Sequence, residues 1–188
     1  LLFTLFSLCA LVLFAVWLPT HERIEKNKEK EIEKTNVMRI LDAAGVAYTP
    51  YAYSTDVTDG MTIAEKLGEE PYSVFKTLVT RSDKGLYYVF DVPVCMTLNL
   101  KKAAKAVGAK SIEMIKQKEL LPLTGYIHGG CSPIGMKKAF PTVIDDTAHL
   151  FDEICVSAGR VGRQVKLSPT LLAELCGAHF ADIADDCD

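Results

Sequence analysis

Val74-Phe75-Lys76-Thr77-Leu78-Val79-Thr80, then Asp83-Lys84-Gly85, then Leu86-Tyr87-Tyr88-Val89-Phe90-Asp91-Val92 is the stretch that decides the fold. Both apolar runs are rich in β-branched and aromatic residues, which favour strands, and a short polar segment ending in glycine separates them. This pattern predicts two strands joined by a hairpin turn.

Toward the N-terminus, helical and extended patterns alternate. Apolar residues from Ile32 to Leu41 recur with helical spacing, and Gly45 is expected to end that helix. Residues 46–53 are predicted to form a strand, and Pro50 indicates that this strand lies at the edge of a sheet. Thr62 is expected to cap a short helix over residues 63–67.

Toward the C-terminus, short elements continue to alternate. Asn99 is expected to cap one helix, and Ser111 to cap another in which Met114 and Ile115 point inward. Further strands are predicted at residues 142–144, 154–157, 164–167 and 180–183, and a helix at residues 170–176. The chain is therefore predicted to hold a single α+β domain, with a curved, mixed and largely antiparallel, barrel-like sheet surrounded by short helices.

The composition is that of a globular domain with an appendage. Of 188 residues, 49% are hydrophobic and 24% charged, which is sufficient for a substantial core. The formal net charge of −3 argues against a protein that coats nucleic acid through bulk charge. A local basic patch that grips one end of an RNA stays compatible with this charge.

Cysteine and histidine spacing gives no sign of a metal centre. The 6 cysteines contain no CxxC pair, and the 4 histidines show neither HxH nor HExxH spacing. We expect no metal, no cofactor and no disulfide framework, and we interpret Cys155 and Cys176, which lie in apolar runs, as buried thiols.

The N-terminal segment differs from the rest of the chain. Residues 1–19 are almost entirely apolar and reach the lower length limit of a membrane-spanning helix, and residues 20–32 form a linker dense in Glu and Lys. Two interpretations stay open, a membrane anchor and a mis-extended start, and membrane contact is expected only under the first. The main domain is placed at residues 33–186, in the cytoplasm or on the cytoplasmic face of a membrane.

Lys76 is the charged residue that the hairpin does not explain. In a strand it shares a face with Val74, Leu78 and Thr80, and a lysine among apolar neighbours is costly unless its amine reaches water, a partner or a ligand. The alternatives are a lysine on a solvated face and a lysine in a pocket.

The segment Gly125-Tyr126-Ile127-His128-Gly129-Gly130-Cys131-Ser132-Pro133-Ile134-Gly135-Met136-Lys137-Lys138 is the second feature without a structural explanation. Exposed amides of a glycine-rich turn beside lysines can receive a phosphate, a carboxylate or a developing oxyanion. The alternative is a tight connection between two strands. Cys131 beside His128 does not look like an activated nucleophile, and no Ser–His–Asp set is indicated by local spacing.

Several separated motifs occur together and in a characteristic order. They are Glu70-Pro71 with 74–78, Leu100-Lys101-Lys102 with 106–110, Thr124-Gly125-Tyr126 with the loop up to Lys138, Ser157-Ala158-Gly159, and Phe180-Ala181-Asp182-Ile183. Over about residues 33–185 the chain resembles the bacterial YbaK-type Cys-tRNA(Pro) deacylases, relatives of the editing domain inserted in bacterial prolyl-tRNA synthetases.

This resemblance implies a trans-editing enzyme that clears cysteine from Cys-tRNA(Pro), and also from Cys-tRNA(Cys) under one reading. It implies that activity depends on Lys76 and that the substrate's own thiol attacks its ester, so that no protein nucleophile is needed. The substrate-binding residues that it implies are Tyr53, Thr77, Gly129, Gly130, Ser132, Pro133, Ile134, Gly135, Ser157, Gly159 and Gln164. The implied partners are the acceptor end of aminoacyl-tRNA and prolyl-tRNA synthetase in a ternary complex.

One position departs from the family pattern. Gln164 stands where the family has an acid that could pair with the substrate's α-amino group, which leaves the preference for cysteine or alanine open. Two alternatives therefore remain beside the main interpretation: a deacylase for another small amino acid such as alanine on tRNA(Pro), and a non-catalytic module that binds aminoacyl-tRNA. A nucleotide-binding loop is disfavoured because the GK[ST] end of a P-loop is absent from the sequence.

Overall fold

The computed structural model describes residues 33–57 and 59–186, and the chain from Lys34 onward forms one compact unit. The central hairpin is present: β2 (Phe75–Ser82) and β3 (Tyr87–Pro93) pair antiparallel, with Thr77 opposite Asp91. These strands lie in a five-stranded mixed sheet of order β5-β2-β3-β6-β9, in which β6 (Thr142–Asp145) and β9 (His179–Ala181) extend β3 in parallel.

Two smaller sheets complete the curved surface. One has the antiparallel order β1-β8-β7, formed by β1 (Thr49–Ala52), β8 (Arg163–Leu167) and β7 (Ile154–Ser157). A bridge between Val74 and Cys155 joins its β7 to the start of β2. The other pairs β4 (Met96–Leu98) with β10 (Ala184–Asp186). The predicted α+β class with a curved, largely antiparallel sheet is confirmed, and β1, which contains Pro50, lies at an edge.

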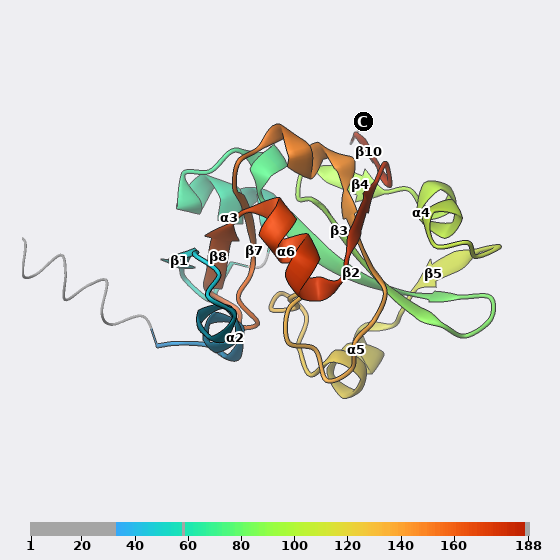
Figure 1. Ribbon diagram of the computed structural model, residues 1–188, viewed down its shortest axis with the longest axis horizontal. Helices are drawn as coiled ribbons and strands as arrows, with labels where there is room; N and C mark the ends of the chain where they lie inside the picture. The colour runs from blue at the N-terminus through green and yellow to red at the C-terminus, as the bar shows by residue number, and fades with distance from the viewer. Residues whose placement is uncertain (1–32, 58, 187–188) are drawn as a thin grey trace, which may run out of the picture. The chain divides into compact units, whose positions relative to one another are not determined.

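Five α-helices surround the sheets in the described part of the chain (Figure 1). They are α2 (Asn36–Ala44), α3 (Gly60–Leu67), α4 (Leu100–Ala106), α5 (Gln117–Thr124) and α6 (Pro169–Cys176), with 3-10 turns at Pro71–Ser73 and Asp146–Leu150. In Figure 1, α2 and α3 lie at the end of the unit that holds β1, α4 lies at the opposite end near β4, and α5 lies below the sheet.

Two helix boundaries match the prediction, and a third does not. Gly45 ends α2 with a φ of 67°, and the Asn99 side chain caps α4 by accepting from the amides of Lys101 and Lys102. The start of α3 was expected at Thr62, but Asp59 is its cap and accepts from the Thr62 amide at 2.9 Å. A carboxylate three residues earlier is the stronger acceptor for the free amides of the first turn.

The helix expected after Ser111 is wrong. Residues Ile112–Met114 form β5, which pairs with the last three residues of β2, and Met114 is exposed rather than inward-pointing. The partner strand overrides the local capping signal here. A helix does follow, but it is α5, which begins only at Gln117.

The core lies on both faces of the central hairpin. On one face, Phe90, Val92 and Val143 pack with Ala103 of α4 and with Ile183. Each large apolar side chain that is fully buried in this way contributes about 1.5–3 kcal/mol to stability. Because side chains alternate along β3, Asp91 points to the opposite face, the face on which Thr77 lies.

No helix within the described residues has the length and apolar character to cross a membrane. The predicted apolar segment 1–19 and the linker 20–32 lie outside those residues.

Candidate active site

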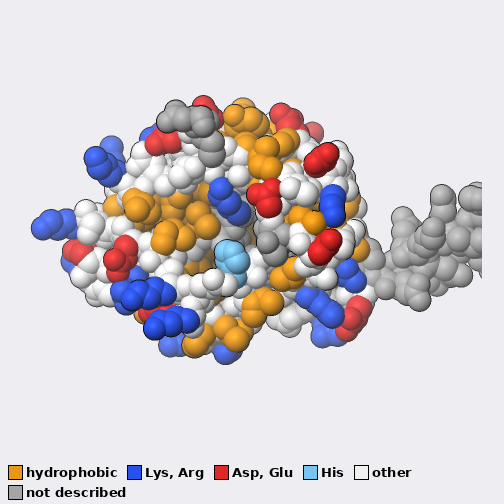
Figure 2. Space-filling model, turned by 180° about the vertical axis from the view of Figure 1, so that it is seen from behind, with side chains coloured by type: hydrophobic (Ala, Val, Ile, Leu, Met, Phe, Trp, Pro, Cys, Tyr) orange, Lys and Arg blue, Asp and Glu red, His pale blue; other side chains and the backbone are white. Residues whose placement is uncertain are grey.

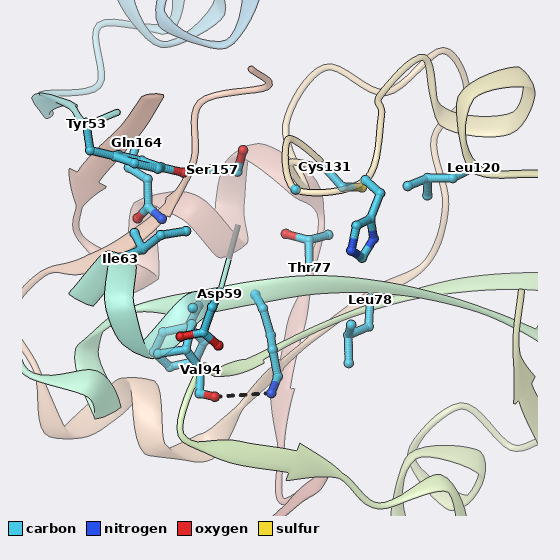
Figure 3. Close-up of a pocket in the computed structure, with 15 residues that line it drawn as sticks. Tyr53, Asp59, Ile63, Thr77, Leu78, Val94, Leu120, Cys131, Ser157 and Gln164 are labelled. Carbon is cyan, nitrogen blue, oxygen red and sulfur yellow. Dashed lines mark hydrogen bonds between the residues drawn. The ribbon is translucent and has the colours of Figure 1, made fainter. Parts of the chain in front are cut away.

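A pocket of about 310 Å³ opens beside the first half of β2 (Figure 3). Its wall is formed by Tyr53, Asp59, Gly60, Ile63, Phe75, Lys76, Thr77, Leu78, Val94, Leu120, His128, Gly129, Cys131, Ser157 and Gln164. These residues come from the segment just after β1, the start of α3, β2, the turn after β3, α5, the glycine-rich loop, the end of β7 and β8, so the pocket gathers segments distant in sequence.

A gap along the edge of β2 explains why the pocket forms there. At one end β7 bridges this edge through Val74, and at the other end β5 pairs with it from Thr80 onward. Between these points, no strand in the described part of the chain pairs with the edge. The carbonyl of Val79 points toward β5, where it accepts from the Ile115 amide, and backbone groups alternate in direction along a strand. The backbone N–H and C=O of Thr77 therefore face the gap.

Lys76 lies along the pocket with its amine at the turn after β3. Its Nζ donates to the carbonyl oxygens of Met96 at 2.6 Å and of Val94 at 3.2 Å, the latter drawn as the dashed line in Figure 3. Lys76 is half-buried, and Asp59, the cap of α3, is close enough to interact with it electrostatically. Two backbone carbonyls thus hold the Lys76 amine at the pocket wall, and of the two sequence-based alternatives the structure supports a lysine in a pocket.

A polar wall stands opposite, where Tyr53, Ser157 and Gln164 come together (Figure 3). Ser157 and Gln164 face each other across the β7–β8 pair, and Tyr53 donates its amide to the Gly162 carbonyl at 3.0 Å. Burial raises the pKa of the Tyr53 phenol, although hydrogen bonds from Gly162 and Gln164 partly offset this rise. The phenol therefore stays protonated and can donate a hydrogen bond into the pocket.

The glycine-rich loop divides into two parts. Its first part brings Gly129 and Cys131 to the pocket. Gly130 packs behind them: a Cβ atom there would lie 3.0 Å from the backbone nitrogen of Val161, so the loop approaches the β7–β8 turn too closely for a side chain. Tyr126 closes the loop by donating to the Ile134 carbonyl at 2.6 Å.

The second part of the loop faces away from this pocket. Pro133, Ile134 and Gly135 line a separate cavity of about 190 Å³ with Ile40 and Phe140. Gly135 has a φ of 71°, and a Cβ atom there would lie 2.7 Å from Ile40.

Two further predicted residues support the backbone. Ser132 is fully buried and accepts from the Ile134 amide at 3.3 Å. Gly159, which has a φ of 80°, lies against Tyr126.

The structure thus separates the predicted site residues into two groups. It brings Lys76, Tyr53, Thr77, Gly129, Ser157 and Gln164 together around one pocket. It places Gly130, Ser132, Pro133, Ile134, Gly135 and Gly159 outside the lining, where they shape the loop and turn that carry the first group.

Sequence reasoning did not assign Asp59 or His128 to the site. Thr62 was expected at the helix start that Asp59 caps, and His128 was considered only as a partner for Cys131. His128 is exposed and lines the pocket next to Gly129. Its position inside the glycine-rich loop was the available signal.

Cys131 lies in the pocket wall as a neutral thiol. Burial, and secondarily the nearby carboxyl of Asp91, raises the pKa of the Cys131 thiol to about 12. A thiol in this state is a poor nucleophile at neutral pH.

Asp91 is the most perturbed acid near the site. Its carboxyl is fully buried, and neither oxygen has a hydrogen-bond partner among the described residues. Burial raises the pKa of Asp91 to about 7. The neighbouring Thr77 hydroxyl partly offsets this rise, although the two groups do not meet the geometry of a hydrogen bond. Perturbed acids beside a pocket mark functional sites more often than ordinary surface acids do.

Comparison with known proteins identifies the family. Residues 56–175 match the model of the aminoacyl-tRNA editing domain. A curated relative from Enterococcus faecalis (strain ATCC 700802 / V583) is 45% identical over 158 residues, which cover 83% of this chain and 96% of the relative. The chain therefore belongs to the aminoacyl-tRNA editing domain family. It is an enzyme of the class that acts on the aminoacyl ester.

The names of the relatives are more specific than the class. The Enterococcus protein carries the name "Putative Cys-tRNA(Pro)/Cys-tRNA(Cys) deacylase EbsC". A crystal structure described as "a putative trans-editing enzyme for prolyl tRNA synthetase" superposes with a TM-score of 0.69 at 26% identity, covering 81% of this chain and 99% of that one. A crystal structure of a hypothetical protein, 23% identical, shares the fold with a TM-score of 0.74 over 80% of this chain and 100% of the other.

Proposed function

We propose that this protein is a trans-editing deacylase that removes cysteine from Cys-tRNA(Pro), and that Cys-tRNA(Cys) is a second substrate. The observation that carries this proposal is a small pocket with a fixed lysine and a neutral cysteine, in a family of aminoacyl-tRNA editing domains. The name of the Enterococcus relative supports the same amino acid and the same tRNAs.

The size of the pocket fits a small aminoacyl group. About 310 Å³ is near the lower end of ligand-binding cavities, which suits a cysteinyl ester with part of the terminal ribose. Ile63, Leu78 and Leu120 add apolar surface to the wall. A synthetase pocket separates amino acids of similar size poorly, and a second site that tests the product supplies the missing discrimination.

The proposed chemistry uses the substrate's own sulfur. The cysteinyl thiol attacks the ester carbonyl, a carbon–sulfur bond forms, and the bond between that carbon and the ribose oxygen breaks. The proton of the thiol is transferred to the ribose oxygen, so the products are a cyclic thiolactone and tRNA with a free hydroxyl. The protein contributes orientation and stabilisation of the developing negative charge, which together account for large rate effects.

Six residues of the pocket wall receive roles in this proposal. Lys76 provides the positive charge, held in place by the Val94 and Met96 carbonyls, and contacts the terminal adenosine at its phosphate or 2′-hydroxyl region. The amide of Gly129 and the amide of Thr77 at the open edge of β2 are the candidate donors to the carbonyl oxygen. Tyr53, Ser157 and Gln164 shape the opposite wall.

The RNA contact is proposed to be local. On the face drawn in Figure 2, lysine and arginine side chains are interspersed with acidic and hydrophobic ones, without a continuous field of one charge. Such a surface suits recognition of the acceptor end, with prolyl-tRNA synthetase supplying tRNA identity in a ternary complex. We place the catalytic domain at residues 33–186, and the reaction in the cytoplasm, where charged tRNA is used.

A substrate panel tests the proposal. The purified chain is incubated with Cys-, Ala- and Pro-tRNA(Pro), and with Cys-tRNA(Cys), and release of the amino acid is followed. We expect rapid loss of cysteine and at least about 10-fold slower loss of alanine and proline, the discrimination that a pocket gives on small side chains. Preferential release of alanine would replace the cysteine assignment. Binding of charged tRNA without release from any substrate would instead show a non-catalytic binding module.

A further inference from the structure

Asp91 is a fully buried carboxyl to which the proposed reaction gives no role. A buried carboxyl whose two oxygens have no hydrogen-bond partner among the described residues is costly, and such groups call for a functional explanation. Polar replacements such as Asn, and apolar ones of similar size, would avoid the cost of a buried charge.

Thr77 connects Asp91 to the pocket. It lies directly opposite Asp91 across the β2–β3 pair, so the two side chains share one face of the sheet at contact distance. Thr77 also lines the pocket, at the point where the edge of β2 is open. Its hydroxyl oxygen is itself buried and lacks a hydrogen-bond partner among the described residues. A hydroxyl can donate to one group and accept from another, so it can link a carboxylate to a ligand.

The other acid and the amide side chain at the pocket do not offer a free negative charge to a cationic group of the substrate. An aminoacyl ester carries an α-ammonium group, and Gln164 on the opposite wall is neutral. Asp59 is exposed, and one of its oxygens already accepts from the amide and the hydroxyl of Thr62 at the start of α3. Asp91 is the fully buried acid behind the wall, where a charge acts most strongly.

We propose that Asp91 is the anionic partner of the substrate's α-ammonium group and acts through the hydroxyl of Thr77. This inference rests on the proposed function, because it assumes an aminoacyl ester in the pocket. When the ammonium group enters, Asp91 releases its proton to solvent, Thr77 donates to the resulting carboxylate, and the Thr77 oxygen accepts from the ammonium group. Asp91 is then a positioning residue, and Thr77 is the residue that touches the substrate.

The groups packed around Asp91 do not compete for this role. Cys131 from the loop and Cys176 from α6 are the titratable groups that interact with it electrostatically, and burial raises the pKa of both thiols to about 12. Burial likewise raises the pKa of Tyr126, which lies near both cysteines, to about 12. All three stay neutral between pH 5 and 8, so none of them releases a proton in that range, and the comparison with Asp91→Asn identifies the part of any proton release that depends on Asp91.

Binding of two uncleavable analogues tests the inference independently of turnover. One is 3′-cysteinylamino-adenosine, in which an amide replaces the ester. The other is its 3-mercaptopropionyl counterpart, which lacks only the amino group. Calorimetry at pH 6.5 in two buffers of different ionisation enthalpy gives both affinity and proton release.

For the wild-type chain we expect about 10-fold tighter binding of the amino analogue, as for one charge-assisted hydrogen bond, and release of on the order of half a proton. In Asp91→Asn and in Thr77→Val, which keep the shapes of both side chains, the preference should fall to below about 3-fold. The proton release should disappear in Asp91→Asn. The exposed Asp152, before β7, supplies the matched control Asp152→Asn, which should behave as the wild type.

Equal affinities of the wild type for the two analogues, absence of binding, or an unchanged preference in Asp91→Asn would overturn the inference. Deacylation of Cys-tRNA(Pro) measured on the same preparations separates the two claims. A wild-type chain that cleaves the ester but does not distinguish the analogues retains the proposed function and loses this role of Asp91. A chain that binds the amino analogue selectively yet cleaves no ester retains the ammonium site and loses the deacylase.

Discussion

Lys76 and Asp91 lie on neighbouring strands of the same hairpin, one register position apart, and both interrupt apolar runs. Both are charged residues in predicted strands, but only Lys76 stands out from the sequence. The structure distinguishes them: the Lys76 amine donates to two backbone carbonyls, whereas neither oxygen of Asp91 has a hydrogen-bond partner among the described residues. The hydrogen bonds of the Lys76 amine fix its position. The Asp91 carboxyl lacks such bonds, so its energy depends strongly on any group that enters the pocket beside it.

The largest effect is expected from the satisfied member of this pair. Lys76→Ala should lower the rate of Cys-tRNA(Pro) deacylation by roughly 100-fold or more, as for loss of one preorganised charge in a catalytic site. Thermal unfolding should change little, because Lys76 is half-buried and its carbonyl partners can turn to water. Lys76→Met, which keeps the chain length and apolar contacts without the charge, is the control for packing. Full activity in either variant would contradict the role of Lys76.

Asp91→Asn is expected to change the dependence of stability on pH. The folded-state pKa of about 7 lies above the unfolded value near 3.9, so the unfolded chain ionises first as the pH rises. The contribution of Asp91 is therefore full below about pH 4 and is lost as the pH rises through 7, with an upper limit of about 4 kcal/mol.

Urea unfolding of the wild type and of Asp91→Asn at pH 5 and pH 8 measures this effect. The variant should gain stability relative to the wild type at the higher pH. Parallel stabilities at both pH values would show that the carboxyl is not destabilised by burial.

A smaller effect is expected on the side of the loop that faces away from the pocket. Gly135→Ala combines a φ of 71° with a clash against Ile40, and should cost about 2–3 kcal/mol of stability. Gly45→Ala is the matched control, because its φ of 67° is similar but open space surrounds it, and it should cost about 1 kcal/mol. Equal losses would mean that the contact with α2 carries no energy.

The smallest effect concerns the start of α3. Asp59→Ala removes the cap of a helix whose first turn borders the pocket, and should lower stability by about 1 kcal/mol. Asp59→Asn retains the acceptor and should stay within a few tenths of a kcal/mol of the wild type. A loss of the same size in both variants would assign the effect to the charge beside Lys76 rather than to the cap.

The hairpin, the edge strand with Pro50, the glycine that ends α2 and the asparagine that caps α4 could be predicted from the sequence, because each depends on local chemistry. The strand β5 could not, because Ile112–Met114 is extended only through its pairing with the end of β2. The helix α5, which contains Pro122, was not predicted as a separate element, because a helix was expected directly after Ser111. Rules based on local sequence fail where pairing with a strand distant in sequence determines the secondary structure.

The same division applies to the site. Lys76 stands out as a lysine between apolar residues, and the loop stands out by its glycines. The separation of the loop into a pocket side with Gly129 and a scaffold side with Gly135 depends on which element each glycine packs against, and sequence spacing does not report this. Asp91 was passed over as a strand residue, because its position behind Thr77 follows from the register of the hairpin.

The central claim is that the substrate's thiol, and no group of the protein, attacks the ester at the pocket beside Lys76. Its most direct test compares deacylation of Cys-tRNA(Pro) with that of the same charged tRNA after S-methylation of the cysteine. The proposed mechanism predicts that methylation reduces the rate at least about 100-fold, to that of spontaneous ester hydrolysis, while binding of the charged tRNA persists. Cleavage of the methylated substrate at an undiminished rate would contradict it and would require a nucleophile or an activated water supplied by the protein.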